Sequence, residues 1–106
     1  MTHRYYVFGS ATGTPADIGP AIALALGAEC EVRDSSYAGG AYCLLRGTDF
    51  DRLTVEANWE DDDGCLAEPD YPDARVLLYL TNPAPRVLET LSALPEVAEL
   101  SALVLD

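Results

Sequence analysis

Two stretches of apolar residues at helical spacing, one in the first third of the chain and one near its end, constrain the fold most. Their apolar positions are Ile18, Ala21, Ile22, Ala25 and Leu26, then Val87, Leu88, Leu91 and Leu94. Thr14 or Asp17 is expected to cap the first helix, and Asn82 the second, with Pro83 as its first helical residue. The sequence therefore predicts two amphipathic helices.

The remaining regular segments have the residue types of β-strands. In the segment 53–59, Leu53, Val55, Ala57 and Trp59 alternate with Thr54, Glu56 and Asn58, which predicts a half-buried strand of an antiparallel sheet. We expect Glu56 and Asn58 to point outward from that strand. The segment 75–81 is apolar on both faces and predicts a central strand. The other expected strands are 4–8, 30–33, 41–46 and 99–105.

This order of elements, β-α-β-β-β-β-α-β, predicts an α+β fold. A length of 106 residues is that of a single domain, here residues 1–106. We expect a mainly antiparallel sheet of five or six strands with both helices on one face. The strand-helix-strand arrangement at each end resembles the two halves of a ferredoxin-like fold, with an additional hairpin inserted between them.

The charge is strongly negative, because 18 acidic residues stand against 6 arginines and give a net charge of −12. Such a field disfavours direct binding to nucleic acid or to an anionic membrane. No signal-peptide pattern begins the sequence, and the longest apolar stretch is too short to span a bilayer. Cys30, Cys43 and Cys65 are an odd number at irregular spacing, which favours reduced, mostly buried thiols and a cytoplasmic location; a Cys30–Cys43 bridge is the alternative.

Acidic residues are most crowded between residues 49 and 73, which hold ten of the 18 acids and, before residue 74, only Arg52 as a base. Crowded carboxylates repel one another, so stability alone does not favour them, whereas their field would speed the approach of a basic partner. Trp59 and Tyr71 lie among them, and such side chains anchor protein interfaces. The predicted partner-binding residues are Asp49, Asp51, Glu56, Trp59, Glu60, Asp61, Asp62, Asp63, Asp70 and Tyr71. The alternative is a solvated acidic loop with Trp59 in the core.

Catalytic and metal-binding patterns are poorly represented. The single histidine, His3, leaves no pair for nucleophilic catalysis, and with three scattered cysteines it makes no zinc motif. The run Asp61-Asp62-Asp63-Gly64 does not meet the spacing of a calcium loop. We therefore expect no enzyme activity, no cofactor and no metal site. The alternatives are a weak surface site for calcium or magnesium in the acidic run and a small enzyme that uses Asp or Glu chemistry.

The central part of the chain resembles the immunity proteins of bacterial polymorphic-toxin and contact-dependent inhibition systems. The residues that carry this resemblance are Gly39-Gly40-Ala41-Tyr42, the run Leu53 to Asp63 with Asn58-Trp59, Asp70-Tyr71-Pro72, and Val76-Leu77-Leu78-Tyr79. The resemblance implies a non-enzymatic protein that binds one cognate toxin domain and occludes its active or substrate-binding site. We expect a monomer or weak dimer. Many such toxins act on nucleic acids through basic clefts, which agrees with the acidic charge.

A second hypothesis comes from a different class of protein. The segment Gly9–Thr14 joins an expected strand to an expected helix, where backbone amides can hold a small anion, although it lacks the lysine and the spacing of a phosphate-binding loop. A ferredoxin-like regulatory module would bind a small metabolite there. The simpler interpretation of the segment is a turn.

Overall fold

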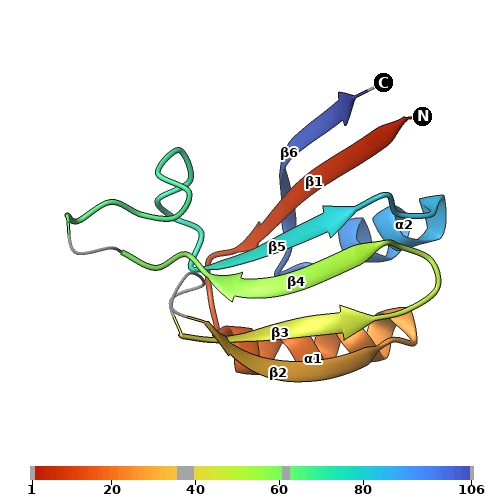
Figure 1. The fold of residues 1–106 in the computed structure, drawn as a ribbon, viewed down its shortest axis with the longest axis horizontal. Helices are drawn as coiled ribbons and strands as arrows, with labels where there is room; N and C mark the ends of the chain where they lie inside the picture. The colour runs from red at the N-terminus through yellow and green to blue at the C-terminus, as the bar shows by residue number, and fades with distance from the viewer. Residues whose placement is uncertain (1, 36–39, 61–62, 106) are drawn as a thin grey trace.

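The computed structural model describes residues 2–35, 40–60 and 63–105, and it shows two helices packed on one side of a six-stranded sheet (Figure 1). The predicted α+β class and element order are confirmed. The elements are β1 (His3–Ser10), α1 (Pro15–Leu26), β2 (Glu29–Ser35), β3 (Gly40–Arg46), β4 (Arg52–Ala57), β5 (Val76–Thr81), α2 (Pro85–Ala93) and β6 (Ala98–Leu105).

The strands lie in the order β2-β3-β4-β5-β1-β6, and every neighbouring pair is antiparallel. Without β2 and β3, the remaining elements are β1-α1-β4-β5-α2-β6, and their strands lie in the order β6-β1-β5-β4. This is the split arrangement of a ferredoxin-like fold. The hairpin of β2 and β3 is inserted after α1 and extends the sheet beyond β4.

The hydrophobic core lies between the sheet and the two helices. Phe8, Leu53 and Leu78 point from β1, β4 and β5 toward this side and are completely buried. Ile22 of α1 and Leu91 of α2 pack against them. The opposite side of the sheet has no helix on it (Figure 1). Glu31, Tyr79 and Tyr5 point to this side, because their strand neighbours pack in the core and neighbouring residues of a strand point to opposite faces. This side is called the open face below.

The buried side of α1 differs from the predicted stripe. Ile18, Ile22 and Leu26 are buried as expected, but Ala21 and Ala25 are exposed, and Gly19 and Ala23 are buried in their place. The reason is the close approach of α1 to β3, where the helix turns its smallest residues toward the sheet. A Cβ atom on Gly19 would lie 2.5 Å from the Sγ atom of Cys43.

The predicted start of the second helix is wrong. Helix α2 is capped by the backbone of Ala84 and has no side-chain cap. Asn82 instead adopts a left-handed conformation with φ 48° at the end of β5. Its side chain accepts a hydrogen bond from the Arg4 backbone N–H at 2.8 Å and donates one to Asp51 at 2.7 Å. Asn82 therefore joins β1 to the start of β4, a contact between segments far apart in the sequence.

The three cysteines lie in different environments. Cys43 is buried, Cys30 is half-buried beside it, and both are free thiols. Burial raises the pKa of Cys43 to about 11, with a further contribution from Cys30. Cys65 is exposed, so the expectation of mostly buried thiols does not hold for this residue.

We predict that Gly19→Ala destabilises the protein, although alanine is the better helix former by about 0.5–1 kcal/mol. The new methyl group meets both the Sγ and Cβ atoms of Cys43, and overpacking of this kind costs about 1–3 kcal/mol. The free energy of unfolding in urea measures the effect. In a Cys43→Ala background the cost should be smaller, because the closest contact is gone; a more stable Gly19→Ala protein would contradict the packing.

Candidate functional site

The segment that joins β4 to β5, residues 58–75, folds around the side chain of Asn58. The Asn58 Nδ2 group donates to the carbonyl oxygens of Tyr71 at 3.0 Å, Ala74 at 2.9 Å and, at the longer distance of 3.4 Å, Glu68. Its Oδ1 atom accepts a hydrogen bond from the Glu68 N–H at 2.9 Å. One amide thus satisfies backbone groups from three parts of the segment, which is named the acidic loop below.

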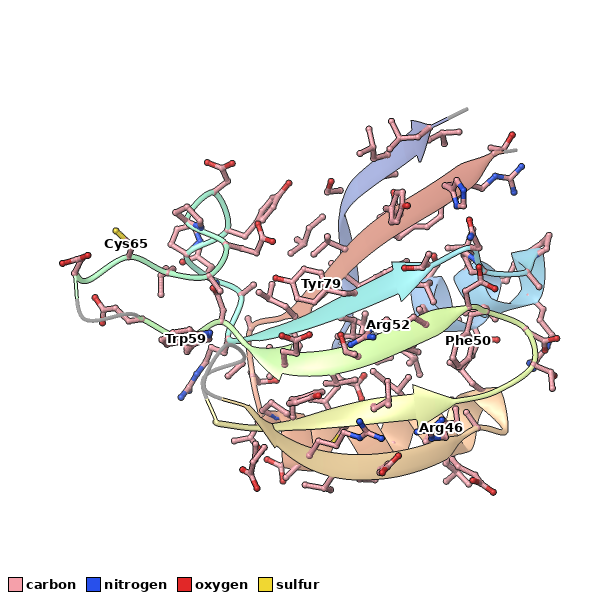
Figure 2. All side chains as sticks on the ribbon, in the orientation of Figure 1. Arg46, Phe50, Arg52, Trp59, Cys65 and Tyr79 are labelled. Carbon is pink, nitrogen blue, oxygen red and sulfur yellow. The ribbon has the colours of Figure 1, made fainter. Side chains whose placement is uncertain are left out.

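Two tyrosines attach the acidic loop to the sheet. The Tyr71 hydroxyl donates to the carbonyl oxygen of Leu100 in β6 at 3.0 Å, and the Tyr79 hydroxyl of β5 donates to the Glu68 carboxylate at 3.0 Å. Tyr79 points from the open face, and Figure 2 shows the loop beside the ends of β4 and β5. The loop is therefore held to the sheet at two points, Glu68 and Tyr71.

The Tyr79 hydroxyl remains a donor at any physiological pH. Burial raises its pKa far above the ordinary value, and the negative charges of Glu68 and Glu56 raise it further. Glu56 is half-buried on β4 and accepts a hydrogen bond from the Thr54 hydroxyl at 2.6 Å. Glu56, expected to point outward, thus lies on the open face but is engaged with its neighbours.

Glu60 and Asp70 of the acidic loop are exposed and form no ion pair with a described residue, although Arg75 lies at the end of the same loop. Ion pairs form elsewhere in the described chain: Arg33 with Glu31 at 3.2 Å, Arg46 with Glu31 at 3.0 Å, and Arg86 with Asp49. The hydrogen bond from Arg46 is the main reason that the pKa of Glu31 is lowered. Three of the 6 arginines are therefore committed elsewhere in the molecule.

The acidic loop brings together most of the predicted partner-binding residues that the structure describes. These are Glu56, Trp59, Glu60, Asp63, Asp70 and Tyr71, all at the end of β4 or in the acidic loop itself. Glu60, Asp63 and Asp70 are exposed, whereas Trp59 and Tyr71 are each half-buried. Trp59 is thus neither a core residue nor a freely exposed one. Asp61 and Asp62 lie outside the described residues.

Asp49 and Asp51 lie apart from the acidic loop. They precede β4, whereas the loop follows it, and a strand of 6 residues separates the two groups by about 20 Å. Figure 2 shows this separation between the labelled Phe50 and Trp59. Asp49 pairs with Arg86 of α2, and Asp51 accepts from Asn82. These two carboxylates serve internal contacts.

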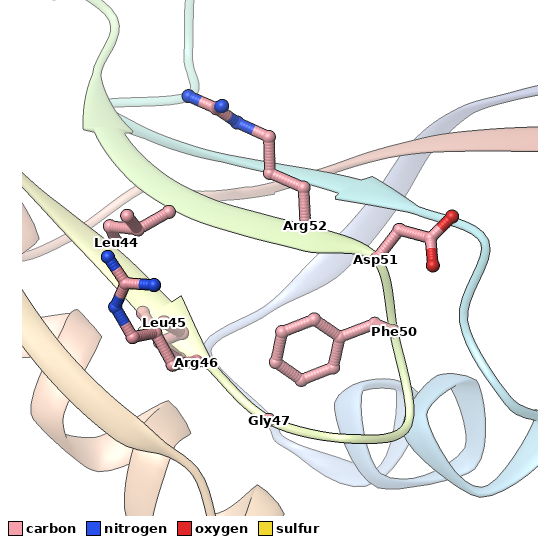
Figure 3. Close-up of a pocket in the computed structure, with 7 residues that line it drawn as sticks. All are labelled: Leu44, Leu45, Arg46, Gly47, Phe50, Asp51 and Arg52. Atoms are coloured by element: carbon pink, nitrogen blue, oxygen red, sulfur yellow. The ribbon is translucent and has the colours of Figure 1, made fainter.

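A pocket of about 290 Å³ lies at this other end of the sheet, between β3 and β4 (Figure 3). Leu44, Phe50 and Gly47 contribute to its wall. Arg46, which is bonded to Glu31, and Arg52 also line it. A smaller, mostly apolar pocket of about 170 Å³ borders residues 9–11, whereas small-molecule sites usually measure about 300–1,000 Å³.

In the segment Gly9–Thr14, Gly9 and Ser10 end β1 and the following residues form a turn before α1. The Ser10 hydroxyl donates to the Thr12 carbonyl at 2.9 Å, and the Thr14 side chain caps the helix as predicted. The Asp17 carboxylate accepts a hydrogen bond from the Thr14 hydroxyl at 3.0 Å and so adds negative charge at the helix start. Metabolite binding at this segment stays a prediction.

Sequence reasoning missed the residues that shape the acidic loop, namely Asn58, Glu68 and Tyr79. Asn58 continued the alternation of β4 and was therefore expected to face outward, but β4 ends at Ala57 and the next residue turns into the loop. One signal was available: Tyr79 is the only hydroxyl-bearing side chain inside the run Val76–Leu80, and a buried phenol needs a partner.

Comparisons of the chain with protein-family models, with curated proteins and with solved structures find no match. Across residues 2–35, 40–60 and 63–105, neither helix has the length and apolar character needed to cross a membrane.

We predict that Asn58→Ala releases the acidic loop from the sheet. Each lost hydrogen bond costs about 0.5–1.5 kcal/mol, so the loss of several should lower the free energy of unfolding by about 2–4 kcal/mol. Hydrogen exchange of the Glu68 and Tyr71 amides, whose positions depend on Asn58, should accelerate more than exchange in β5.

Asn58→Asp is the matched comparison, since it keeps the shape and the acceptor but cannot donate to three carbonyl groups. Its stability should be no higher than that of Asn58→Ala at neutral pH. Full stability of Asn58→Asp would show that the donated hydrogen bonds contribute little.

Proposed function

We propose that this protein is a non-enzymatic acidic inhibitor, an immunity protein, that binds a basic cognate toxin enzyme and occludes its active or substrate-binding site. The observation that carries the proposal is the acidic loop: the exposed carboxylates of Glu60 and Asp70 form no ion pair with a described residue, while hydrogen bonds of Asn58, Tyr71 and Tyr79 hold the loop against the sheet. A charged surface that is already ordered needs to lose little conformational entropy on binding.

The charge of the surface supports a basic partner. A net charge of −12 repels nucleic acid, and a cleft that binds nucleic acid carries the complementary positive charge. Glu60 and Asp70 are exposed and have no ion-pair partner among the described residues, and Asp63 is exposed beside them. In the proposed complex these carboxylates pair with the lysine and arginine residues that would otherwise contact phosphate.

The half-buried aromatic residues supply the apolar part of the proposed interface. Trp59 and Tyr71 each keep part of the side chain exposed, and Tyr71 is oriented by its hydrogen bond to Leu100. A partly held aromatic side chain offers contact area with little freedom left to lose. We place Asp49 and Asp51 outside the interface, because both have internal partners.

The first test is coexpression with the C-terminal domain of the protein encoded immediately upstream. We expect that domain alone to arrest growth, and this protein to relieve the arrest and to copurify with it. The association rate should fall as salt is added, because salt screens the attraction between opposite charges. The proposal would be contradicted if the upstream domain did not arrest growth or did not bind this protein.

We predict that the triple variant Glu60→Lys, Asp63→Lys, Asp70→Lys slows association with the toxin domain by about 10–10³-fold at low salt. The substituted side chains are exposed, so the melting temperature should change little. Stopped-flow mixing or surface plasmon resonance measures the association rate.

The control for this variant is Glu29→Lys, Glu89→Lys, Glu96→Lys, which changes the net charge by the same amount at exposed positions of β2, of α2 and of the segment between α2 and β6. It should slow association much less, because none of the reversed charges lies in the acidic loop. Equal effects of the two triple variants would show that only the net charge matters and would remove the acidic loop as the binding site.

A further inference from the structure

The two edge strands of the sheet, β2 and β6, differ in their protection against pairing with other strands. Strand β2 carries Glu29, Glu31, Arg33 and Asp34, all of them exposed. Strand β6 has no charged residue from Leu100 to Leu105. Charged side chains on an edge strand oppose the addition of another strand, so β2 is protected and β6 is not.

The exposed apolar side chains gather at the β6 edge. In the described chain the exposed large hydrophobic residues are Tyr5, Leu24, Val32, Leu103, Val104 and Leu105. Leu103, Val104 and Leu105 are 52%, 56% and 48% exposed, and Tyr5 lies opposite Leu103 in the pairing of β1 with β6. Because neighbouring residues of a strand point to opposite faces, this end of β6 is apolar on both faces.

At the same end the sheet is only two strands wide, because β1 and β6 extend beyond β5. Pairing of β1 with β5 begins at Tyr5, so His3 and Arg4 have a strand neighbour only in β6. Figure 1 shows β1 and β6 running on together, away from the helices. A two-stranded ribbon without a further strand is marginally stable in water, and the outer side of β6 has no strand beside it in the described chain.

We propose that β6 pairs antiparallel with β6 of a second copy of this chain around a two-fold axis, which joins two six-stranded sheets into one continuous sheet. Two copies that each carry a charge of −12 repel one another, and the run Leu100–Leu105 is where their edges meet without a carboxylate. Apolar side chains on both faces of one strand are matched by the same side chains on the other.

Charged residues bound this run on both sides, because Glu99 precedes it and Asp106 follows it in the sequence. Contact between two copies is therefore confined to the uncharged residues from Leu100 to Leu105.

Sedimentation equilibrium of the purified chain alone tests the proposal. We expect a reversible monomer–dimer equilibrium that shifts toward dimer as salt is added, because salt screens repulsion between two negative chains. Leu103→Lys should raise the dissociation constant at least about tenfold, since a charge replaces a buried leucine in both copies. Amide exchange in β6 should slow as protein concentration rises.

Val32→Lys is the matched control, because Val32 is 64% exposed on the other edge strand and the variant has the same net charge as Leu103→Lys. It should dimerise at least as well as the unmodified chain. A chain that stays monomeric at every concentration, or dimers that survive Leu103→Lys, would overturn the proposal.

This test is separate from that of the inhibitor function, because it uses no toxin domain and predicts the opposite dependence on salt. If the chain alone is monomeric and Leu103→Lys abolishes toxin binding, β6 accepts a strand of the toxin and the dimer is wrong. If the chain dimerises and no toxin binds, the dimer stands and the inhibitor function falls.

Discussion

Two helices cover only one face of the six-stranded sheet, and the rest of the structure depends on this constraint. Six antiparallel strands present two faces, and both helices lie on the same one. The covered face is made of aliphatic side chains such as Leu53 and Val55, which are completely buried. The open face has to be compatible with water without a second layer, and Glu31, Glu56 and Tyr79 place hydrogen-bonded polar groups on it.

The two ends of the open face are made compatible with water in different ways. Toward β2 and β3 it is polar, with Glu31 held between Arg33 and Arg46. Toward β5 and β1 it is apolar: Leu77 points to this side, away from the main core cluster, yet is completely buried. The acidic loop lies over this end and is attached through Tyr79 and Tyr71. Its ordered conformation is thus a consequence of covering the sheet, and its carboxylates are left to solvent.

The two edges of the sheet are also unequally protected against pairing with another strand. Charged residues line β2, whereas the end of β6 is uncharged and exposed on both faces. The acidic loop and the β6 edge therefore offer two surfaces of opposite character, one governed by long-range charge and the other by short-range apolar contact. Added salt weakens attraction to the first and relieves repulsion at the second, which makes the two surfaces separable in solution.

Much of the fold was predictable from residue patterns. Helical spacing, one alternating strand and the residue types of the other strands predicted all eight elements and their order, and the strand-helix-strand ends indicated the ferredoxin-like arrangement. The errors fell where a local pattern competed with a distant partner. Asn82 resembles a helix cap, but its side chain bonds Arg4 and Asp51; Ala21 fits a helical stripe, but the approach of α1 to Cys43 selects Gly19 instead.

The candidate site, too, was predictable from the sequence only in part. By itself the sequence determined the acidic charge, the presence of Trp59 and Tyr71 among the carboxylates, and the alternation of β4, because these depend on residue type and spacing alone. Only the tertiary structure decided that Asp49 and Asp51 lie about 20 Å from the acidic loop, and that Asn58 folds the loop. Hydrogen bonds and strand pairing join residues that are distant in the chain, and no local pattern encodes which partner such a residue will meet.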